Sequence, residues 1–400
     1  MNIAFISYWS CPLTRLGVLS SGGMNVYVLN LANNLGTLGH TVDIYTHSHH
    51  ENDEKILQIH KNVRIIHFSV HTIDHYQGVE SFANKMLDFM GKNSLQYDLL
   101  HSHYFYSSLV GQIIKKSLHI PLFTTFHALG ITKELYGGIS DKLRIQSEKN
   151  IVNFSDGIIS SVELEKKELV DKYKADAQKI FVVAPGVNHH VFKKIDRKKA
   201  RMKIGITSDE KIILFVGRID PIKGISILIN AVSKLSKKFT DFKDNFKVLL
   251  IGGDIESRTF WRNPEVIKIQ TLIERLDLAC CIKFIGNRPH NVLPYYYSAS
   301  DIVIMPSRYE SFGLVVLEAM ASGTAVIASK VGGLSYLIKD KVSGRFFRSG
   351  DVENLGEVIW ELLNDDKQRD NLGKKAIIES QKYCWDLQAE KIIGFYKKYL

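Results

Sequence analysis

Short apolar runs alternate with segments of helical periodicity along the whole 400-residue chain. In the first half the runs that predict buried strands are "NIAFISY", "TVDIYTH", "VRIIHFS", "DLLHSH", "PLFTTFH", "GIISS" and "IFVVA". In the second half they are "KIILFVG", "KVLLIGG", "IKFIG", "DIVIMPS", "TAVIAS" and "GRFF". Stretches such as Met24 to Leu38 lie between them and carry their apolar residues on one helical face. Apolar strands separated by helices predict parallel sheets covered on both faces.

The two sets of strands predict two doubly wound α/β domains. A chain of 400 residues fits two domains of roughly 200 residues each. We place the boundary after "VVAPGVNHHVF", which gives an N-terminal domain of residues 1–190 and a C-terminal domain of residues 191–384. The segment "KKIDRKKARMKIG" beyond the boundary is polar and basic, as a linker or an exposed helix would be. After Gly350 the pattern is helical.

The composition is ordinary for a globular protein, with 45% hydrophobic and 24% charged residues. The formal charge of +10 suits phosphorylated metabolites, nucleic acid or an acidic membrane surface, or it reflects a generic Lys-rich surface. The sequence contains no run of eighteen uncharged apolar residues, so we expect no membrane span. The stretch "MNIAFISYWS" predicts a first buried strand, not a signal peptide.

The cysteines Cys11, Cys280, Cys281 and Cys384 have no spacing typical of metal ligands. We expect the adjacent Cys280 and Cys281 to be small buried residues. This cysteine usage favours the reducing cytoplasm.

Open α/β sheets bind ligands at the carboxyl ends of their strands. The first candidate junction is "SSGGMNVYV", where Gly22 and Gly23 precede a helix whose amides could meet a phosphate. The alternative is a helix start that needs a flexible turn. The second junction is "LFVGRIDPIKG", where Arg218 and Lys223 follow Gly217 at the end of a buried strand. An arginine fork and a lysine point charge form a candidate diphosphate clamp, with two surface cations as the alternative.

The third junction is the stretch "SRYESFGLVVLEAM", which carries Glu310 and Glu318. It starts a helix whose free amides we expect around Ser311 to Val315. Glu318, about two turns into an apolar and therefore buried helix, needs a hydrogen-bonding partner or a ligand. An ionised carboxylate only accepts hydrogen bonds, which suits the vicinal hydroxyls of a ribose or a hexose. A carboxylate tied to Arg or to the backbone is the alternative.

Histidines provide two further candidates. His127 closes the strand "PLFTTFH" at its ligand-facing end, with a hydrogen-bonded core or loop histidine as the alternative. His47, His49 and His50 have no carboxylate or cysteine at ligand spacing, and no D-x-D follows a strand. We therefore expect no metal site and no required metal.

The motifs "GGMNVYV", "VVAPGV", "GRIDPIKG", "PYYYSASDIVIMPS" and "ESFGLVVLEAMASGT" occur in this order over nearly the whole chain. Together they resemble the family-four retaining glycosyltransferases of GT-B fold, above all the inositol-phosphate N-acetylglucosaminyltransferases of mycothiol synthesis and the sucrose-phosphate synthases. The resemblance implies two Rossmann-like domains with the active site in the cleft between them. The C-terminal domain would hold the nucleotide sugar and the N-terminal domain the acceptor, with a terminal helix at about 385–400 joining the N-terminal domain.

The resemblance also implies roles for single residues. Arg218 and Lys223 would stabilise the departing diphosphate, Glu310 and His127 would contact the sugar, and Glu318 would accept the ribose hydroxyls. The implied catalytic residues are thus Arg218, Lys223, His127 and Glu310. The implied donor-binding residues are Gly22, Gly23, Gly217, Arg288, Ser311, Phe312, Gly313, Leu314, Val315 and Glu318.

On the acceptor side the resemblance implies Asn25, Tyr104 and Arg144, the last two at positions that bind an acceptor phosphate in the family. The chain departs from the family pattern in two places. Ala128 replaces a hydroxyl residue directly after the histidine, and the region after the third strand offers no lysine. The acceptor is therefore a phosphorylated polyol or sugar, a different phosphate, or a compound without phosphate.

We expect a cytoplasmic retaining glycosyltransferase that moves a hexosyl group from a nucleotide-diphosphate sugar, with UDP favoured, to an acceptor hydroxyl. It needs no cofactor and binds no nucleic acid; a homodimer and peripheral association with the inner face of the membrane remain alternatives. One rival is a membrane-associated enzyme of lipid or cell-surface polysaccharide synthesis. Another is a nucleotide-sugar-binding protein without catalysis, which the intact candidate residues disfavour. A dinucleotide oxidoreductase is disfavoured because neither half has G-x-G-x-x-G with an acidic residue ~20 positions later.

Overall fold

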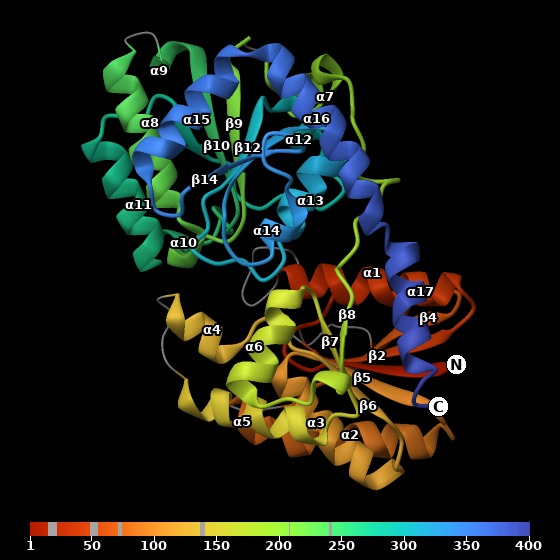
Figure 1. The fold of residues 1–400 in the computed structure, drawn as a ribbon. Coiled ribbons are helices and arrows are strands. Elements are labelled where there is room, and N and C mark those ends of the chain that lie inside the picture. The colour runs from red at the N-terminus through yellow and green to blue at the C-terminus, as the bar shows by residue number, and fades with distance from the viewer. Residues whose placement is uncertain (15–21, 49–54, 71–73, 137–140, 208, 240–241) are drawn as a thin grey trace. The chain divides into compact units, whose positions relative to one another are not determined.

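The computed structural model describes residues 1–14, 22–48, 55–70, 74–136, 141–207, 209–239 and 242–400. The chain forms two compact α/β units (Figure 1). The described residues of the first unit lie in Met1–Thr14, in 22–186 and in Trp385–Leu400. The second contains Val187–Cys384. The predicted fold class of two doubly wound α/β domains is confirmed.

The first unit alternates strands and helices. Its strands are β1 (Asn2–Ser7), β2 (Thr41–His47), β3 (Ile56–His60), β4 (Val63–Phe68), β5 (Leu99–His103), β6 (Leu122–Thr125), β7 (Gly157–Ser160) and β8 (Ile180–Val182). Its helices are α1 (Gly23–Thr37), α2 (His75–Lys92), α3 (Phe105–Leu118), α4 (Gly130–Leu135), α5 (Lys142–Phe154), α6 (Glu163–Tyr173) and α17 (Trp385–Tyr396), with a 3₁₀ turn at Ala177–Lys179.

Among the described residues these strands form one sheet in the order β3-β4-β2-β1-β5-β6-β7-β8. All pairs are parallel except β3 with β4, which is antiparallel and irregular between Gln58 and His60. The apolar runs predicted every strand of this sheet except β3. That strand lies at the sheet edge with all five residues at least partly exposed, so "ILQIH" lacks the continuous apolar run of a buried strand.

The second unit repeats the alternation. Its strands are β9 (Lys211–Val216), β10 (Phe246–Ile251), β11 (Ile282–Phe284), β12 (Ile302–Met305), β13 (Ala325–Ser329) and β14 (Arg345–Phe347). Its helices are α7 (Arg197–Lys203), α8 (Ile225–Lys238), α9 (Phe242–Asn245), α10 (Arg258–Trp261), α11 (Pro264–Arg275), α12 (Leu293–Ala299), α13 (Leu314–Ala321), α14 (Leu334–Leu337), α15 (Val352–Asn364) and α16 (Asp366–Ser380), with 3₁₀ turns at Pro221–Lys223 and Gln381–Tyr383.

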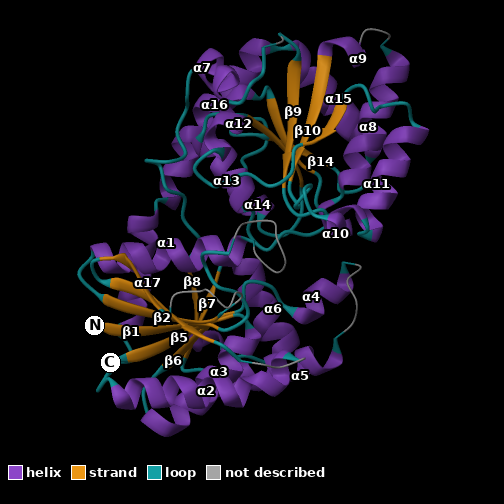
Figure 2. Ribbon diagram, turned by 180° about the vertical axis from the view of Figure 1, so that it is seen from behind, coloured by secondary structure: helices purple, strands orange, loops and turns teal. Residues whose placement is uncertain are grey.

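The second sheet is parallel throughout its described strands, in the order β11-β10-β9-β12-β13-β14. Helices cover both faces of each sheet (Figure 2). In the first unit α2, α3 and α5 lie on one face and α1 and α17 on the other; in the second, α8, α11 and α15 lie opposite α12, α13 and α16. This double cover is why central strands such as β9 and β12 are apolar and buried along nearly their whole length.

The basic segment after the predicted boundary forms the helix α7, which is mostly exposed, in line with the second of the two predicted alternatives, although its Ala200 and Arg201 are buried against α12. The Nε of Arg201 donates to the carbonyl of Ala299 at 3.2 Å. Cys281 is buried as expected, but Cys280 is exposed in the turn that precedes β11.

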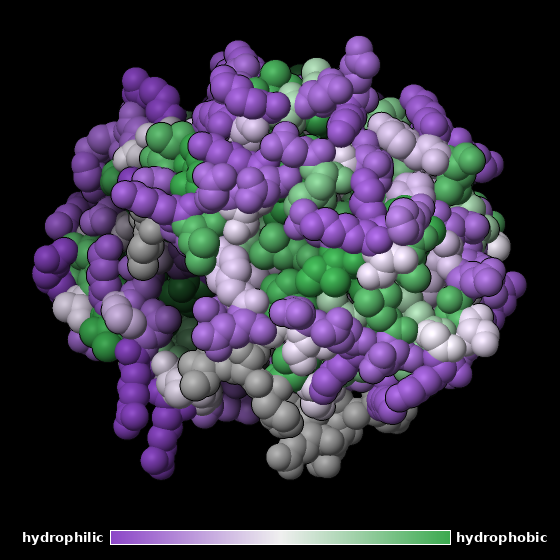
Figure 3. Space-filling model, turned by 90° about the horizontal axis from the view of Figure 1, so that it is seen from below, coloured by the Kyte–Doolittle hydropathy of each residue, from purple (hydrophilic) through white to green (hydrophobic). Residues whose placement is uncertain are grey.

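Figure 3 shows one face on which hydrophilic side chains border an apolar area. No helix in the described part of the chain is long and apolar enough to cross a membrane.

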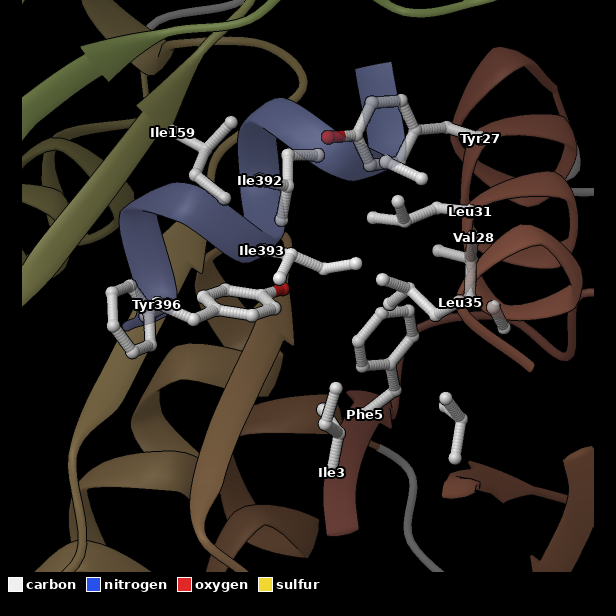
Figure 4. Close-up of a cluster of buried hydrophobic side chains, with 14 of the residues drawn as sticks. Ile3, Phe5, Tyr27, Val28, Leu31, Leu35, Ile159, Ile392, Ile393 and Tyr396 are labelled. Atoms are coloured by element: carbon white, nitrogen blue, oxygen red, sulfur yellow. The ribbon is translucent and has the colours of Figure 1, made fainter. Parts of the chain in front are cut away.

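The C-terminal helix α17 is part of the first unit's core (Figure 4). Its Ile392, Ile393 and Tyr396 face the apolar side of α1, which carries Val28 and Leu31. Each fully buried aliphatic or aromatic side chain contributes about 1.5–3 kcal/mol, so a segment nearly four hundred residues from the N-terminus stabilises the first sheet. Tyr396 also pairs its hydroxyl with Nδ1 of His101 on β5 at 2.6 Å.

Candidate functional site

The second sheet has a topological switch point between β9 and β12, where the chain order reverses. Ligands of open α/β sheets bind at such a point, beyond the carboxyl ends of the strands. The loop 217–224 follows β9, and the loop 306–313 follows β12. These are the two loops in which the sequence predicted the diphosphate clamp and the sugar carboxylate.

The two loops are tied together by their backbones. The N–H of Arg308 donates to the carbonyl of Ile222 at 2.7 Å. Gly224 has a φ of +67°, and an added Cβ would lie 2.1 Å from the carbonyl oxygen of Pro306. The close approach therefore requires glycine at this position. Gly217 connects the β9 end of the loop to β10, because its N–H donates to the carbonyl of Ile251 at 2.9 Å.

Lys223 and Glu310 meet at this switch point. The Nζ of Lys223 donates to Oε2 of Glu310 at 2.6 Å, and the two side chains are only 15% and 14% exposed. The hydroxyl of Ser307 donates to the same oxygen at 3.4 Å. Arg218 is half exposed, and its Nη2 lies 3.7 Å from Oδ2 of Asp220. The site therefore combines a fixed lysine–carboxylate pair with an exposed guanidinium that can meet an anion.

Helix α13 begins beside this pair. Its N-cap is Gly313 with a φ of +105°, and no side chain caps the first turn. An added Cβ at Gly313 would lie 2.4 Å from Leu334, so glycine is needed there too. Leu314 and Val315 open the helix and present uncapped amides, whereas Ser311 and Phe312 precede it. Such amides, together with the helix dipole, favour an anion.

Glu318 is buried, with 4% of its surface exposed, and lies just over one turn into α13, not two turns as predicted. The Nε2–H of His290 donates to its Oε1 at 2.8 Å, and the hydroxyl of Tyr297 donates to its Oε2 at 2.8 Å. Among the described residues, neither an Arg nor a backbone N–H holds the carboxylate. Burial lowers the pKa of His290, but the charge of Glu318 and its hydrogen bond outweigh burial and leave the pKa raised.

His290 and Tyr297 were missed by the sequence prediction. They lie in the motifs "GNRPH" and "PYYYSAS", and the only signal was that Glu318 had to have a partner. Arg288, two residues before His290, donates from Nε to the hydroxyl of Tyr296 at 3.1 Å and from Nη1 to the carbonyl of Asn287 at 2.9 Å. Its guanidinium is thereby held at the carboxyl end of β11.

The first sheet has its own switch point between β1 and β5. Gly22 is the N-cap of α1, and Gly23 is its first residue. Asn25 is fully buried, and its Nδ2 donates to the hydroxyl of Ser10 at 2.9 Å and to the carbonyl of Cys11 at 2.6 Å. Asn25 therefore fixes the loop after β1. Tyr104 follows β5 with a φ of +76°.

His127 lies beyond the end of β6 with a φ of +62°. Its Nε2 shares a hydrogen bond of 3.2 Å with Nδ1 of His103, and its ring packs edge-on against Tyr27. Burial lowers the pKa of His127 to about 3. The imidazole is therefore neutral at pH 7 and can position a sugar hydroxyl but cannot supply a positive charge.

Arg144 is 5% exposed and forms a buried ion pair, with Nε 2.7 Å from Oε1 of Glu148. Its Nη2 donates to the carbonyl of Ala128 at 2.5 Å, and its guanidinium lies 4.9 Å from the ring centre of Tyr104. Glu148 also accepts hydrogen bonds from the N–H of Gly130 and the hydroxyl of Tyr173. Arg144 thus lies beside Tyr104, and its Nε and Nη2 are engaged by Glu148 and by the carbonyl of Ala128. The acceptor-binding role of both residues stays a prediction.

Among the described residues no group of three or more His, Cys, Asp or Glu side chains is arranged to hold a metal ion. The ring of His47 is engaged with the carbonyls of Ser48 and Val70. His49 and His50 lie outside the described residues.

Comparison with known proteins extends over the whole chain. Residues 196–378 match the family model described as glycosyl transferases group 1, and residues 21–191 match the model described as glycosyltransferase family 4. A D-inositol 3-phosphate glycosyltransferase of Corynebacterium glutamicum (strain R) is 33% identical over 412 residues, which cover 99% of this chain and 96% of that protein. The protein of the same name from Kribbella flavida is 31% identical over 410 residues, with 99% and 95% covered.

Two solved structures have a fold similar to that of this chain. A sucrose-phosphate synthase from Thermosynechococcus elongatus has a TM-score of 0.90 and 29% sequence identity, with 99% of this chain and 98% of that chain covered. Anabaena HepE in complex with UDP-glucose has a TM-score of 0.78 at 20% identity, with both chains covered completely, and shows the same fold.

Proposed function

The chain belongs to the family-four glycosyltransferases of GT-B fold, and from this membership we propose that it transfers a hexosyl group from a UDP-sugar to a hydroxyl of a phosphorylated polyol or sugar, with retention of the anomeric configuration. The observation that carries the donor assignment is the contact of Lys223 with Glu310 at the switch point of the second sheet. It unites a cation for a diphosphate with a carboxylate for sugar hydroxyls.

The reaction exchanges one bond for another at the anomeric carbon. The bond to the diphosphate oxygen breaks, the bond to the acceptor oxygen forms, and the acceptor's proton passes to the departing diphosphate. Lys223, Arg218 and the free amides of α13 stabilise the charge that grows on the leaving group. Glu310 accepts hydrogen bonds from the sugar, and Glu318 accepts them from the ribose. Neutral His127 positions a sugar hydroxyl.

The names of three similar proteins support a phosphorylated acceptor. The names of the Corynebacterium and Kribbella proteins specify D-inositol 3-phosphate, and the solved structure at 29% identity is a sucrose-phosphate synthase. In this chain Tyr104 and Arg144 lie side by side near the switch point of the first sheet. Charge-assisted bonds to phosphate are roughly twice as strong as neutral ones, so even a shared guanidinium favours an anionic acceptor.

Membrane docking through the first unit is disfavoured. The first unit has exposed apolar side chains, for example Leu135 and Leu143. However, almost all of the chain's excess positive charge falls in residues 187–384. The first unit therefore has little net attraction for an anionic membrane surface.

A donor panel with matched acceptors tests the proposal. UDP-, ADP- and GDP-sugars are each incubated with an inositol phosphate, a hexose phosphate and their dephosphorylated forms, and release of nucleoside diphosphate is measured. We expect release from a UDP-sugar to rise with a phosphorylated acceptor and to rise less with its neutral form. Equal use of the neutral acceptor would overturn the acceptor assignment, and release only from ADP- or GDP-sugars would overturn the UDP assignment.

A further inference from the structure

We propose that His290 and Tyr297 are positioning residues that hold Glu318 in the orientation that accepts both hydroxyls of the donor's ribose. This inference rests on the proposed function, which assigns Glu318 to the ribose. In this proposal His290 and Tyr297 fix the carboxylate, and the fixed orientation of the carboxylate gives the specificity for ribose.

Glu318 has acceptor capacity for a ribose in addition to its two protein partners. A carboxylate offers about four lone-pair sites, two on each oxygen. His290 occupies one site on Oε1 and Tyr297 one site on Oε2, each at 2.8 Å. The part of the chain that the structure describes supplies no other donor to this carboxylate, so one site remains on each oxygen. A vicinal diol donates two hydrogen bonds side by side, which matches one free site on each of the two oxygens.

The two donors are themselves held in place. Tyr297 is fully buried on α12, and its backbone carbonyl accepts a hydrogen bond from the hydroxyl of Thr324 at 2.7 Å. Phe192 packs against both rings, with centroid distances of 4.8 Å to His290 and 6.1 Å to Tyr297. The terminal torsion of a glutamate has a broad energy minimum, so without fixed donors the carboxylate plane would rotate freely. His290 and Tyr297 remove this freedom before the ligand arrives.

The two donors also stabilise the buried carboxylate. A carboxylate with 4% exposure is destabilising unless hydrogen-bond donors compensate for the lost water. Two such donors are present, and although burial lowers the pKa of His290, the charge of Glu318 and its hydrogen bond leave that pKa raised. Removing either donor should thus loosen the carboxylate and weaken ribose recognition, whereas the diphosphate contacts at Lys223 and Arg218 should persist.

The test compares UDP with 2′-deoxy-UDP by isothermal titration calorimetry. Wild type should bind UDP more tightly. His290→Ala and Tyr297→Phe should each weaken UDP binding by about 3- to 10-fold, the range for one lost hydrogen bond. Both should weaken 2′-deoxy-UDP binding less, because that ligand keeps only its 3′-hydroxyl for Glu318, so that the preference for ribose narrows. His290→Gln, whose amide can replace Nε2–H, should restore part of the preference. His190→Ala, at an exposed histidine of the same unit, is the matched control.

Kinetics supplies a second readout. Because the ribose is bound equally in the ground state and in the transition state, the His290 and Tyr297 variants should raise the donor KM and leave kcat nearly unchanged. Thermal unfolding confirms that each variant is folded. An equal loss of affinity for UDP and 2′-deoxy-UDP would overturn the positioning role, since a merely structural defect does not distinguish the two ligands.

One further variant separates this inference from the proposed function. If Glu318→Gln leaves both the affinity for UDP and the preference for UDP over 2′-deoxy-UDP unchanged, Glu318 does not bind the ribose and the assignment made under the proposed function fails. If Glu318→Gln removes the preference but His290→Ala and Tyr297→Phe keep it, only the positioning role fails. Absence of UDP binding by wild type would overturn both.

Discussion

The ammonium group of Lys223 lies 2.6 Å from Oε2 of Glu310, although the two residues are 87 positions apart in the chain. Each residue follows a different strand, and β9 and β12 are neighbours in the second sheet. The pair therefore links the diphosphate side of the candidate site to the sugar side. Both side chains are mostly buried, so a change in one affects the other.

Replacing Lys223 with Ala should lower kcat/KM by ~10²–10³, the scale of losing one electrostatic donor to the transition state. It should also lower the melting temperature of the second unit, because Glu310 is left without its cation in a mostly buried place. The double variant Lys223→Ala/Glu310→Gln should recover much of the stability but not the activity. Steady-state kinetics of the two variants measures kcat/KM, and thermal unfolding measures their melting temperatures. Wild-type turnover of Lys223→Ala would refute the clamp.

Arg218→Ala is the matched comparison for the Lys223 variant. The Arg218 side chain is 50% exposed and only 3.7 Å from its nearest carboxylate, so it contributes little to folding. We expect a kinetic loss similar to that of Lys223→Ala with an unchanged melting temperature. A loss of stability without a loss of activity would contradict the assigned role.

Replacing Arg144 with Ala should destabilise the first unit by about 3–5 kcal/mol, because Glu148 would remain buried without its charged partner. The variant therefore reports on folding as well as on the acceptor. Thermal unfolding measures the loss, with Lys149→Ala, an exposed cation on the same helix, as the control. An unchanged melting temperature would show that the ion pair with Glu148 contributes little to the stability of the first unit.

The sequence predicted the parts of the fold that depend on continuous apolar runs. Strands buried on both faces, such as β9 and β12, give continuous apolar runs whose ends can be recognised in the sequence. Arg218, Lys223 and Glu310 follow these ends and were therefore identified as candidate site residues. Strand β3 escaped prediction because an exposed edge strand is under no such constraint. No periodicity relates Glu318 to His290 or Tyr297, because α12 and α13 meet only through tertiary packing. The ion pair of Arg144 with Glu148 is different, because the two residues are four positions apart on α5 and helical spacing alone could have indicated it. The contact of Arg144 with the carbonyl of Ala128 is tertiary and left no signal in the sequence.

Activity should persist in excess chelator. The sequence has no D-x-D after a strand, and Lys223, Arg218 and the amides of α13 can supply the positive charge that a divalent cation would otherwise bring. Turnover of the UDP-sugar is measured before and after treatment with chelator. A loss of turnover that added magnesium or manganese restores would contradict this prediction.

The stability of the first unit should fall as pH rises from about 4.5 to about 7 because of Glu165. Burial raises the pKa of this carboxyl from 4.5 to about 7, against the opposing effect of hydrogen bonds from Ser161 and Ser160. The folded state therefore keeps a proton that the unfolded state releases. The resulting penalty is absent below the unfolded pKa, grows between the two values and is complete above the folded pKa.

Replacing Glu165 with Gln removes this titration. At roughly 1.36 kcal/mol for each pH step between the two pKa values, wild type should lose about 3 kcal/mol relative to the variant between pH 4.5 and pH 8. Urea unfolding of both proteins across this range measures the difference in the free energy of unfolding. Glu163→Gln, an exposed carboxylate at the start of the same helix, controls for the loss of a charge and should show no such trend. A constant difference between wild type and Glu165→Gln at all pH values would mean that Glu165 titrates alike in the folded and unfolded chains.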